Sequence, residues 1–277
     1  MTEKEIKRRK KKTIKELRMI DDTFFAAVFD GHVEETEVLI RTILNRDDIT
    51  VVEAKVQNFI PNLRGHGVSL DILARDREGR AYNIEVQRSN TGATPKRARF
   101  IGAMVDTRLL EKGTDYVLLP DRFTIFITEN DYFKKMEPVY HVENTVKELD
   151  NAPLGDGSSI LYVNGAYRNL ETPIGRLMQD FSCTDSSGII NPVLKKRFRQ
   201  LKEEEGGHRS MCKLMDDLIN DVVTDAVADA VKDDRIDTAK KLIALGDSSL
   251  SNIAKTLDLP LSTVEELASS MGKKNPA

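Results

Sequence analysis

Residues 71–88, DILARDREGRAYNIEVQR, decide how this chain of 277 residues folds. Apolar and polar residues alternate on both sides of a charged turn, which predicts two antiparallel strands joined in a hairpin. A three-residue loop that ends at Gly79 would use this glycine in the left-handed conformation that such loops require. Counting outward from the loop then sets Asp71 directly opposite Glu85, on one face of the sheet.

Two carboxylates that face each other across a hairpin need a compensating charge. Directly opposed β-carbons lie roughly 4.5–5.5 Å apart, so burial would protonate one carboxyl unless a cation lies between them. Hard divalent ions such as Mg²⁺ take oxygen ligands, commonly one or two carboxylates with water and substrate phosphate. The backbone carbonyl of Val86, in the same strand as Glu85, could complete the shell. The hairpin therefore predicts a metal site, and an acidic pair on a solvated sheet edge is the alternative.

The rest of the chain alternates helical and strand patterns, which predicts a mixed α/β fold. The predicted elements are helices in residues 21–44, a strand over 49–57, the hairpin 71–88, a helix over 94–113, strands over 116–120, 123–128 and 159–167, a helix over 173–181, and helices from 191 onward. A loop-rich stretch is expected from about residue 130 to 160, where glycine and proline recur.

The composition, 40% hydrophobic and 31% charged, is that of a soluble globular protein. No apolar run approaches the roughly 20 residues needed to span a bilayer, and none follows the basic start as in a secretory signal. We therefore expect a cytoplasmic protein with no membrane partner. The two cysteines, Cys183 and Cys212, lack the spacing of a zinc site or a disulfide framework.

The formal net charge of −3 is unevenly distributed. Residues 1–20 contain nine Lys or Arg and three Glu, so this basic arm carries +6 and the remainder carries −9. A basic arm on an acidic body is suited to a polyanion, because each neutralised phosphate releases counterions; a solvated, frayed terminus is the alternative. Aspartates recur at every fourth position from Asp217 to Asp233, which predicts an acidic helix face that is either solvated or paired with a basic surface.

Residues 191–277 form the predicted helical C-terminal region. Within it, residues 238–270 predict three helices separated by a glycine and a proline, an arrangement similar to a helix-turn-helix. The last helix carries Glu265 and Glu266 where a groove reader would present Arg, Lys or Asn. DNA reading, plain helical packing and assembly of a homo-oligomer through this tail are the open alternatives.

The spacing of Asp71, thirteen further residues and Glu85-Val86-Gln87 resembles the active site of the PD-(D/E)XK nuclease superfamily, and in particular its PD-(D/E)XK family transposases, which are related to the recombination-promoting nucleases. The supporting blocks are DDTFFAAVF, NIEVQRS, PKRARF, LLPDRFTIFIT and GRLMQDFSCTD, which together cover most of residues 20–215. The resemblance implies a restriction-endonuclease-like core over residues 21–190, with a central mixed sheet flanked by helices in the order α-β-β-β-α-β.

The resemblance also implies roles for particular residues. Asp71 and Glu85 would hold the metal, and Gln87 would act in catalysis at the position where the wider superfamily often has lysine. Glu37, on the preceding helix, would be a further ligand, with a solvated helix residue as the alternative. Three residues would contact phosphates of the substrate, or else form a solvated basic face: Lys96, Arg97 and Arg99.

Gln87 changes the chemistry that such a site can perform. A lysine ammonium stabilises negative charge directly, whereas a glutamine amide only donates and accepts neutral hydrogen bonds. Charge neutralisation would therefore depend more on the metal. Glutamine is the usual residue in the branch that this chain resembles, so it does not by itself argue for an inactive enzyme. The implied function is a Mg²⁺-dependent DNA endonuclease, with Mn²⁺ as a substitute cation, linked to recombination or mobile elements. The alternative is a catalytically weak or inactive nucleic-acid-binding or assembly protein that keeps the fold.

Overall fold

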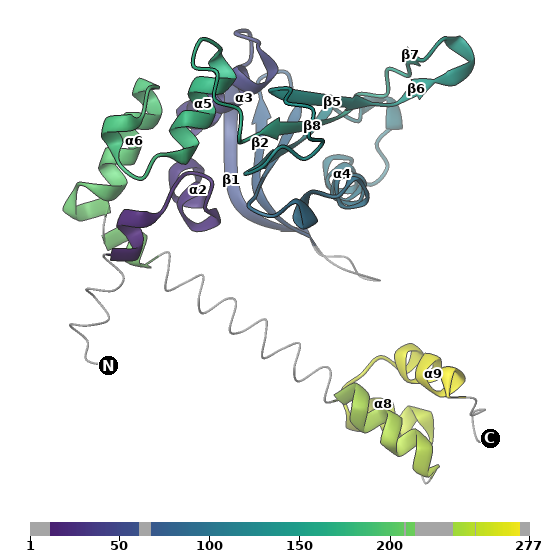
Figure 1. The fold of residues 1–277 in the computed structure, drawn as a ribbon. Helices are drawn as coiled ribbons and strands as arrows, with labels where there is room; N and C mark the ends of the chain where they lie inside the picture. Colours follow the sequence, from purple (N-terminus) through teal and green to yellow (C-terminus); the bar gives the residue numbers. More distant parts are fainter. Residues whose placement is uncertain (1–11, 61–67, 208, 214–234, 247, 272–277) are drawn as a thin grey trace. The chain divides into compact units, whose positions relative to one another are not determined.

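The computed structural model describes residues 12–60, 68–207, 209–213, 235–246 and 248–271 (Figure 1). The chain divides into two compact units, Met1–Met215 and Asp216–Ala277. Among the described residues, no helix is both long enough and apolar enough to cross a membrane.

The first unit is built on a six-stranded sheet with the order β1-β2-β3-β4-β8-β5. Its strands are β1 (Val51–Ile60), β2 (Val68–Asp76), β3 (Ala81–Gln87), β4 (Arg122–Thr128), β5 (Val139–Glu143) and β8 (Ser158–Asn164). The pairs β3–β4 and β4–β8 are parallel, and the other three pairs are antiparallel. A separate short pair, β6 (Thr145–Val146) and β7 (Ala152–Pro153), completes the strands described. The sheet is mixed, as predicted.

Helices cover both faces of this sheet (Figure 1). One hydrophobic core combines residues of α2 (Asp22–Phe29), α3 (Val33–Leu44), α5 (Pro173–Ser182) and α6 (Pro192–Lys202) with Tyr82, Ile84 and Val86 of β3. A second core packs α4 (Pro95–Leu109) against the opposite face, through residues such as Ile101 and Phe126. Strand β3 is therefore buried on both faces, which confirms the mixed α/β fold with a sheet flanked by helices.

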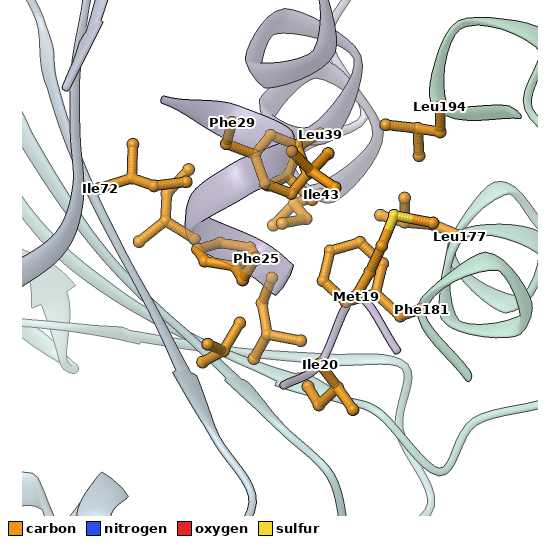
Figure 2. Close-up of a cluster of buried hydrophobic side chains, with 14 of the residues drawn as sticks. Met19, Ile20, Phe25, Phe29, Leu39, Ile43, Ile72, Leu177, Phe181 and Leu194 are labelled. Carbon is orange, nitrogen blue, oxygen red and sulfur yellow. The ribbon is translucent and has the colours of Figure 1, made fainter. Parts of the chain in front are cut away.

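The larger core fixes α2 against the sheet. Phe25 and Phe29, one helical turn apart, have ring centroids separated by 4.7 Å, and both rings contact Phe181 of α5. Leu39 and Ile43 of α3 complete the cluster from the neighbouring helix (Figure 2). Because this side of α2 is buried among aromatic rings, the helix cannot rotate, and the position of its first residue, Asp22, is fixed relative to the strands.

The hairpin has the predicted register. Ile72 pairs with Ile84 and Ala74 with Tyr82. Gly79 has a φ of +85°, and its N–H donates to the carbonyl of Asp76 at 3.1 Å. A side chain at this φ would be strained, so glycine sets the turn and, through the turn, the register of every pair beyond it.

Two predicted elements differ from the structure. Residues 116–120, predicted as a strand, contain the 3₁₀ turn η2 (Tyr116–Leu118), in which Tyr116 is 83% exposed. The Asp115 carboxylate accepts the N–H of Val117 at 3.1 Å, which stabilises the turn over an extended conformation. Helix α4 ends at Leu109, before the expected stop at Gly113. The other 3₁₀ turns are η1 (Asn90–Ala93), η3 (Lys147–Leu149) and η4 (Ser186–Gly188).

The first unit extends beyond both boundaries drawn from the sequence. At its end, α6 buries Leu194, Phe198 and Leu201 in the same core as α2, so it lies with the sheet and past the expected limit at residue 190. At its start, residues 12–20 of the expected basic arm are packed, with Ile14 and Met19 fully buried. Apolar residues at helical spacing between the basic ones explain this packing.

The second unit contains a helical stretch over residues 235–245, α8 (Leu250–Thr256) and α9 (Leu261–Ser270). Its small core includes Ile243, Ile253 and Val264, one from each helix. Glu265 and Glu266 are exposed on α9. The row of aspartates from Asp217 to Asp233 lies outside the described residues.

Candidate active site

Asp71 and Glu85 meet where the hairpin strands separate. The backbone pairs between β2 and β3 end at Ile72 and Ile84. One step further, Oδ2 of Asp71 accepts the N–H of Val86 at 2.8 Å, and the N–H of Asp71 donates to Oε1 of Glu85 at 3.4 Å. Side-chain carboxylates therefore replace the ladder hydrogen bonds at this point, and the two predicted ligands are brought together.

Glu85 is a buried carboxylate with one oxygen that accepts no hydrogen bond from the described residues. Its side chain is fully buried between neighbouring strands, and Oε1 accepts a bond from the Asn83 amide at 3.1 Å. Within the described structure Oε2 has no hydrogen-bond partner, and the closest cation, Nη2 of Arg97, is 3.6 Å away. A fully buried glutamate is incompatible with an acidic pair on a solvated sheet edge. A buried carboxylate oxygen that accepts no hydrogen bond indicates that a positive ligand belongs beside it.

The pair is costly to ionise. Burial, followed by the charge of Asp71, raises the pKa of Glu85 to about 8. Burial also raises the pKa of Asp71 to about 6, although the hydrogen bond from the Val86 N–H lowers it. Desolvation and a neighbouring like charge are the two causes that a cation between the carboxylates would offset.

Val86 supplies a backbone oxygen on the same side as Asp71. The N–H and C=O of one strand residue project toward the same neighbouring strand. Since the Val86 N–H donates to Asp71, its carbonyl faces that side too. Two carboxylates and one carbonyl are the kind of oxygen set that Mg²⁺ accepts together with water and phosphate oxygens. In the described part of the chain, no group of three or more His, Cys, Asp or Glu could hold a metal ion.

Glu37 does not join the pair. One oxygen accepts the N–H of Val51 at 2.9 Å, and the other pairs with Arg41 at 2.9 Å. Val51 pairs with Asp76, five residues along β2 from Asp71, so Glu37 holds the start of β1 at the opposite end of the hairpin. The helix predicted around Glu37 is correct. The direction of its side chain is set by its contacts with Val51 and Arg41, which the family resemblance did not predict.

Asp22 is the acidic residue that comes close to the pair instead. Its charge raises the pKa of Asp71, and burial, followed by the charge of Asp21, raises its own pKa. Asp22 begins α2, whose buried face fixes it toward the end of the sheet. The sequence signal for Asp22 is the doubled aspartate directly ahead of an apolar helix, within the block DDTFFAAVF.

Four charged side chains form an ion-pair network next to this site. Arg18 contacts Glu129 at 2.7 Å and Asp21 at 3.4 Å, and Arg88 contacts both carboxylates at 3.3 Å. Arg88 directly follows Gln87, and Glu129 directly follows β4. An open pocket of about 450 Å³ lies here, lined in part by Asp22 and Arg88. The network links the start of the chain to the carboxyl ends of two central strands.

Gln87 lies against the turn η1. A Cβ added at Gly92 would be 1.7 Å from Oε1 of Gln87, so the amide occupies space that only glycine leaves free. This close approach restricts the rotamers available to Gln87. The side chain is therefore restricted at η1, and it lies on the same face of β3 as Glu85, two residues further along the strand.

The three basic residues of α4 differ in their surroundings. Thr94 accepts the N–H of Arg97 at 3.3 Å and caps the helix, which places all three in its first turns. The Arg97 side chain is 45% exposed and its guanidinium approaches Glu85. Lys96 and Arg99 are exposed. Cations at a helix N-terminus add to its positive dipole end, a combination that attracts anions.

Comparison with known proteins gives a family match that covers the site. A family model described as PD-(D/E)XK nuclease family transposase matches residues 19–167. No curated protein and no solved structure matches the chain. The matched segment is more than half of the chain and includes Asp22, both carboxylates of the hairpin, Gln87 and α4. The chain therefore belongs to the PD-(D/E)XK nuclease family transposases.

Proposed function

We propose that this protein is a metal-dependent endonuclease that hydrolyses phosphodiester bonds in DNA, with Mg²⁺ as its cation and Mn²⁺ as a substitute. The observation that carries the proposal is the buried Oε2 of Glu85, which accepts no hydrogen bond in the described structure, beside Asp71 at the end of the hairpin. Its membership of a nuclease family of transposases supports DNA as the substrate and a link to recombination or mobile elements.

The residues of the site have two proposed roles, cation binding and orientation of the attacking water. Asp71, Glu85 and the Val86 carbonyl are the proposed cation ligands. When bound, the cation would neutralise charge on the scissile phosphate and acidify a nearby water. Gln87, held at Gly92, would orient that water through its amide.

Arg97 is the proposed source of positive charge from the protein itself. Gln87 is neutral, so it cannot balance the charge that develops on the phosphate. The Arg97 guanidinium lies 3.6 Å from Glu85 and is partly exposed, so it can contact both the site and an entering phosphate. Lys96 and Arg99, exposed on the same helix, are proposed to contact neighbouring phosphates of the backbone.

Cleavage of supercoiled plasmid, with and without Mg²⁺, tests the proposal. Wild-type protein should nick the plasmid only with the cation, and Glu85→Gln should lose this activity at least about 100-fold, as removal of a charge-stabilising group does. Glu53→Gln is the matched control, since Glu53 pairs with Lys55 on the surface of β1. Equal cleavage by wild type and Glu85→Gln would rule the site out.

The second candidate is a nucleic-acid-binding or assembly protein that keeps the fold without turnover. The neutral amide of Gln87, where the wider superfamily often has lysine, leaves this candidate open. Salt-dependent binding of DNA by wild-type protein, without any metal-dependent cleavage, would select this candidate.

A further inference from the structure

A buried asparagine lies beside the carboxylate pair. Asn83 is fully buried on β3, two residues before Glu85, so the two side chains lie on the same face of the sheet. Its register partners on the neighbouring strands, Leu73 of β2 and Thr124 of β4, are buried as well. The amide therefore lies in the interior, where a polar group is stable only if it is hydrogen-bonded.

The two polar atoms of this amide differ in their contacts. Nδ2 donates to Oε1 of Glu85 at 3.1 Å, whereas Oδ1 accepts no hydrogen bond within the described structure. A buried amide oxygen without a donor destabilises a fold, so stability alone does not explain an asparagine at this position. The bond that its nitrogen makes goes to a proposed cation ligand, which points to a role at the site.

The contacts of Glu85 separate its two oxygens. Oε1 faces Nδ2 of Asn83 and, at 3.4 Å, the N–H of Asp71. Oε2 accepts no hydrogen bond from the described residues, and it is the oxygen that the Arg97 guanidinium approaches. Rotation of the carboxylate would break the bond to Asn83. A donor on Oε1 therefore fixes the direction of Oε2, which is the oxygen left for a cation.

We infer that Asn83 is a positioning residue, which holds the Glu85 carboxylate with Oε2 directed toward the cation. This role rests on the proposed function, because it takes Asp71 and Glu85 as the ligands. Loss of a hydrogen bond to a ligating carboxylate typically lowers metal affinity 10- to 100-fold, so a loss of about this size is expected without the Asn83 amide.

Isothermal titration with Mn²⁺ tests this role without cleavage as the readout. Asn83→Leu keeps a side chain of similar branched shape but removes the amide, and it should raise the Mn²⁺ dissociation constant about 10- to 100-fold. Thr124→Val is the matched control. Thr124 is equally buried on the neighbouring strand, but its hydroxyl accepts a hydrogen bond from Arg122 at 2.7 Å. This variant should lose thermal stability and keep the wild-type affinity for Mn²⁺.

Thermal unfolding in EDTA separates a positioning role from a structural one. If Asn83→Leu does not fold, Asn83→Ala takes its place, since it removes the amide without adding atoms. Equal losses of Mn²⁺ affinity in the Asn83 variant and in Thr124→Val would assign Asn83 a structural role and overturn the inference. An Asn83 variant that binds Mn²⁺ as tightly as wild type would overturn it as well.

Cleavage of plasmid distinguishes failure of this inference from failure of the proposed function. As Mn²⁺ approaches saturation, Asn83→Leu should regain most of the wild-type rate, because the proposed ligands all remain. A rate that stays low at saturating Mn²⁺ would overturn a role limited to positioning the ligand. If wild-type protein binds Mn²⁺ but never cleaves, the proposed nuclease fails while the titration still decides the role of Asn83. Wild-type protein that binds no Mn²⁺ would overturn both.

Discussion

Asp71 on β2 accepts the backbone N–H of Val86 on β3 at 2.8 Å, one step beyond the last backbone pair of the hairpin. This bond lies where the backbone pairs of the hairpin end, on the side of β3 to which the Val86 carbonyl also points, and it holds the Asp71 carboxylate beside Glu85. The candidate site thus arises from an interrupted ladder in the middle of a sheet, where both faces are buried by helices and a carboxylate is expensive to keep charged.

Replacing Glu85 by glutamine should stabilise the metal-free protein. The substitution keeps the shape but removes a buried carboxylate whose Oε2 accepts no hydrogen bond in the described part of the chain and which faces a second carboxylate. Removing such a buried and unsatisfied carboxylate should raise the free energy of unfolding by about 1–3 kcal/mol. Thermal or urea unfolding in EDTA at pH 8 measures it. Glu53→Gln, on the surface, should change stability little, and a destabilised Glu85→Gln would contradict this description of the pair.

Arg97→Ala should lower the turnover rate of cleavage by about 100-fold, the loss typical when one preorganised charge donor is removed. The reason is the position of its guanidinium 3.6 Å from Glu85. Arg97→Lys should retain part of the activity. Arg99→Ala serves as the comparison: we expect weaker DNA binding at an unchanged saturated rate. Should both alanine variants lose only affinity, Arg97 is a phosphate contact and nothing more.

Gly92→Ala should reduce turnover by displacing Gln87. The new Cβ would lie 1.7 Å from Oε1 of Gln87, so the amide must move, and a small misplacement of an orienting group costs about 10- to 100-fold. DNA affinity should not change. Gly206→Ala, where a Cβ meets nothing within 4 Å, is the matched control.

A double-mutant cycle assigns that effect to Gln87. In a Gln87→Ala background, Gly92→Ala should have little further effect on turnover, because the displaced group is already absent. An equally large loss in both backgrounds would show that the turn η1 itself matters.

Lys202→Met should destabilise the first unit by at least about 2 kcal/mol, since it leaves buried carbonyls without donors. Burial lowers the pKa of Lys202 to about 8, so the ammonium form still dominates at pH 7. Its three protons match three acceptors, the carbonyl oxygens of Lys15, Leu17 and Thr184. Denaturant unfolding measures the loss. Lys196→Met, at an exposed position on the same helix, should stay within about 0.5 kcal/mol of wild type. Comparable losses for both variants would show that the bonds of Lys202 contribute nothing specific.

The parts of the site that were predictable depend on local pattern. Gly79 and the alternation around it are enough to set Asp71 opposite Glu85, because strand register follows from the turn and the period of two. The full burial of Glu85 was not predictable in the same way. It depends on α4 and on the neighbouring strand β4, neither of which is part of the hairpin sequence.

The parts that were missed depend on contacts between distant segments. Asp22 reaches the pair only because aromatic packing holds α2 against the sheet. Arg18 and Arg88 lie 70 positions apart in the sequence and meet over the same two carboxylates. Glu37 shows the reverse case. The helix that contains it was predicted correctly, but its side chain lies away from the site. Helix patterns predict which face is buried, but not which end of a sheet that face will reach.

Binding of Mn²⁺ measures the central claim most directly, because the claim is that Asp71 and Glu85 share one divalent cation. Isothermal titration of wild-type protein should show one Mn²⁺ site per chain. Glu85→Gln, folded as judged by circular dichroism, should bind none at the same concentrations, while Glu53→Gln should bind as wild type does. Equal Mn²⁺ binding by wild type and Glu85→Gln would contradict the account.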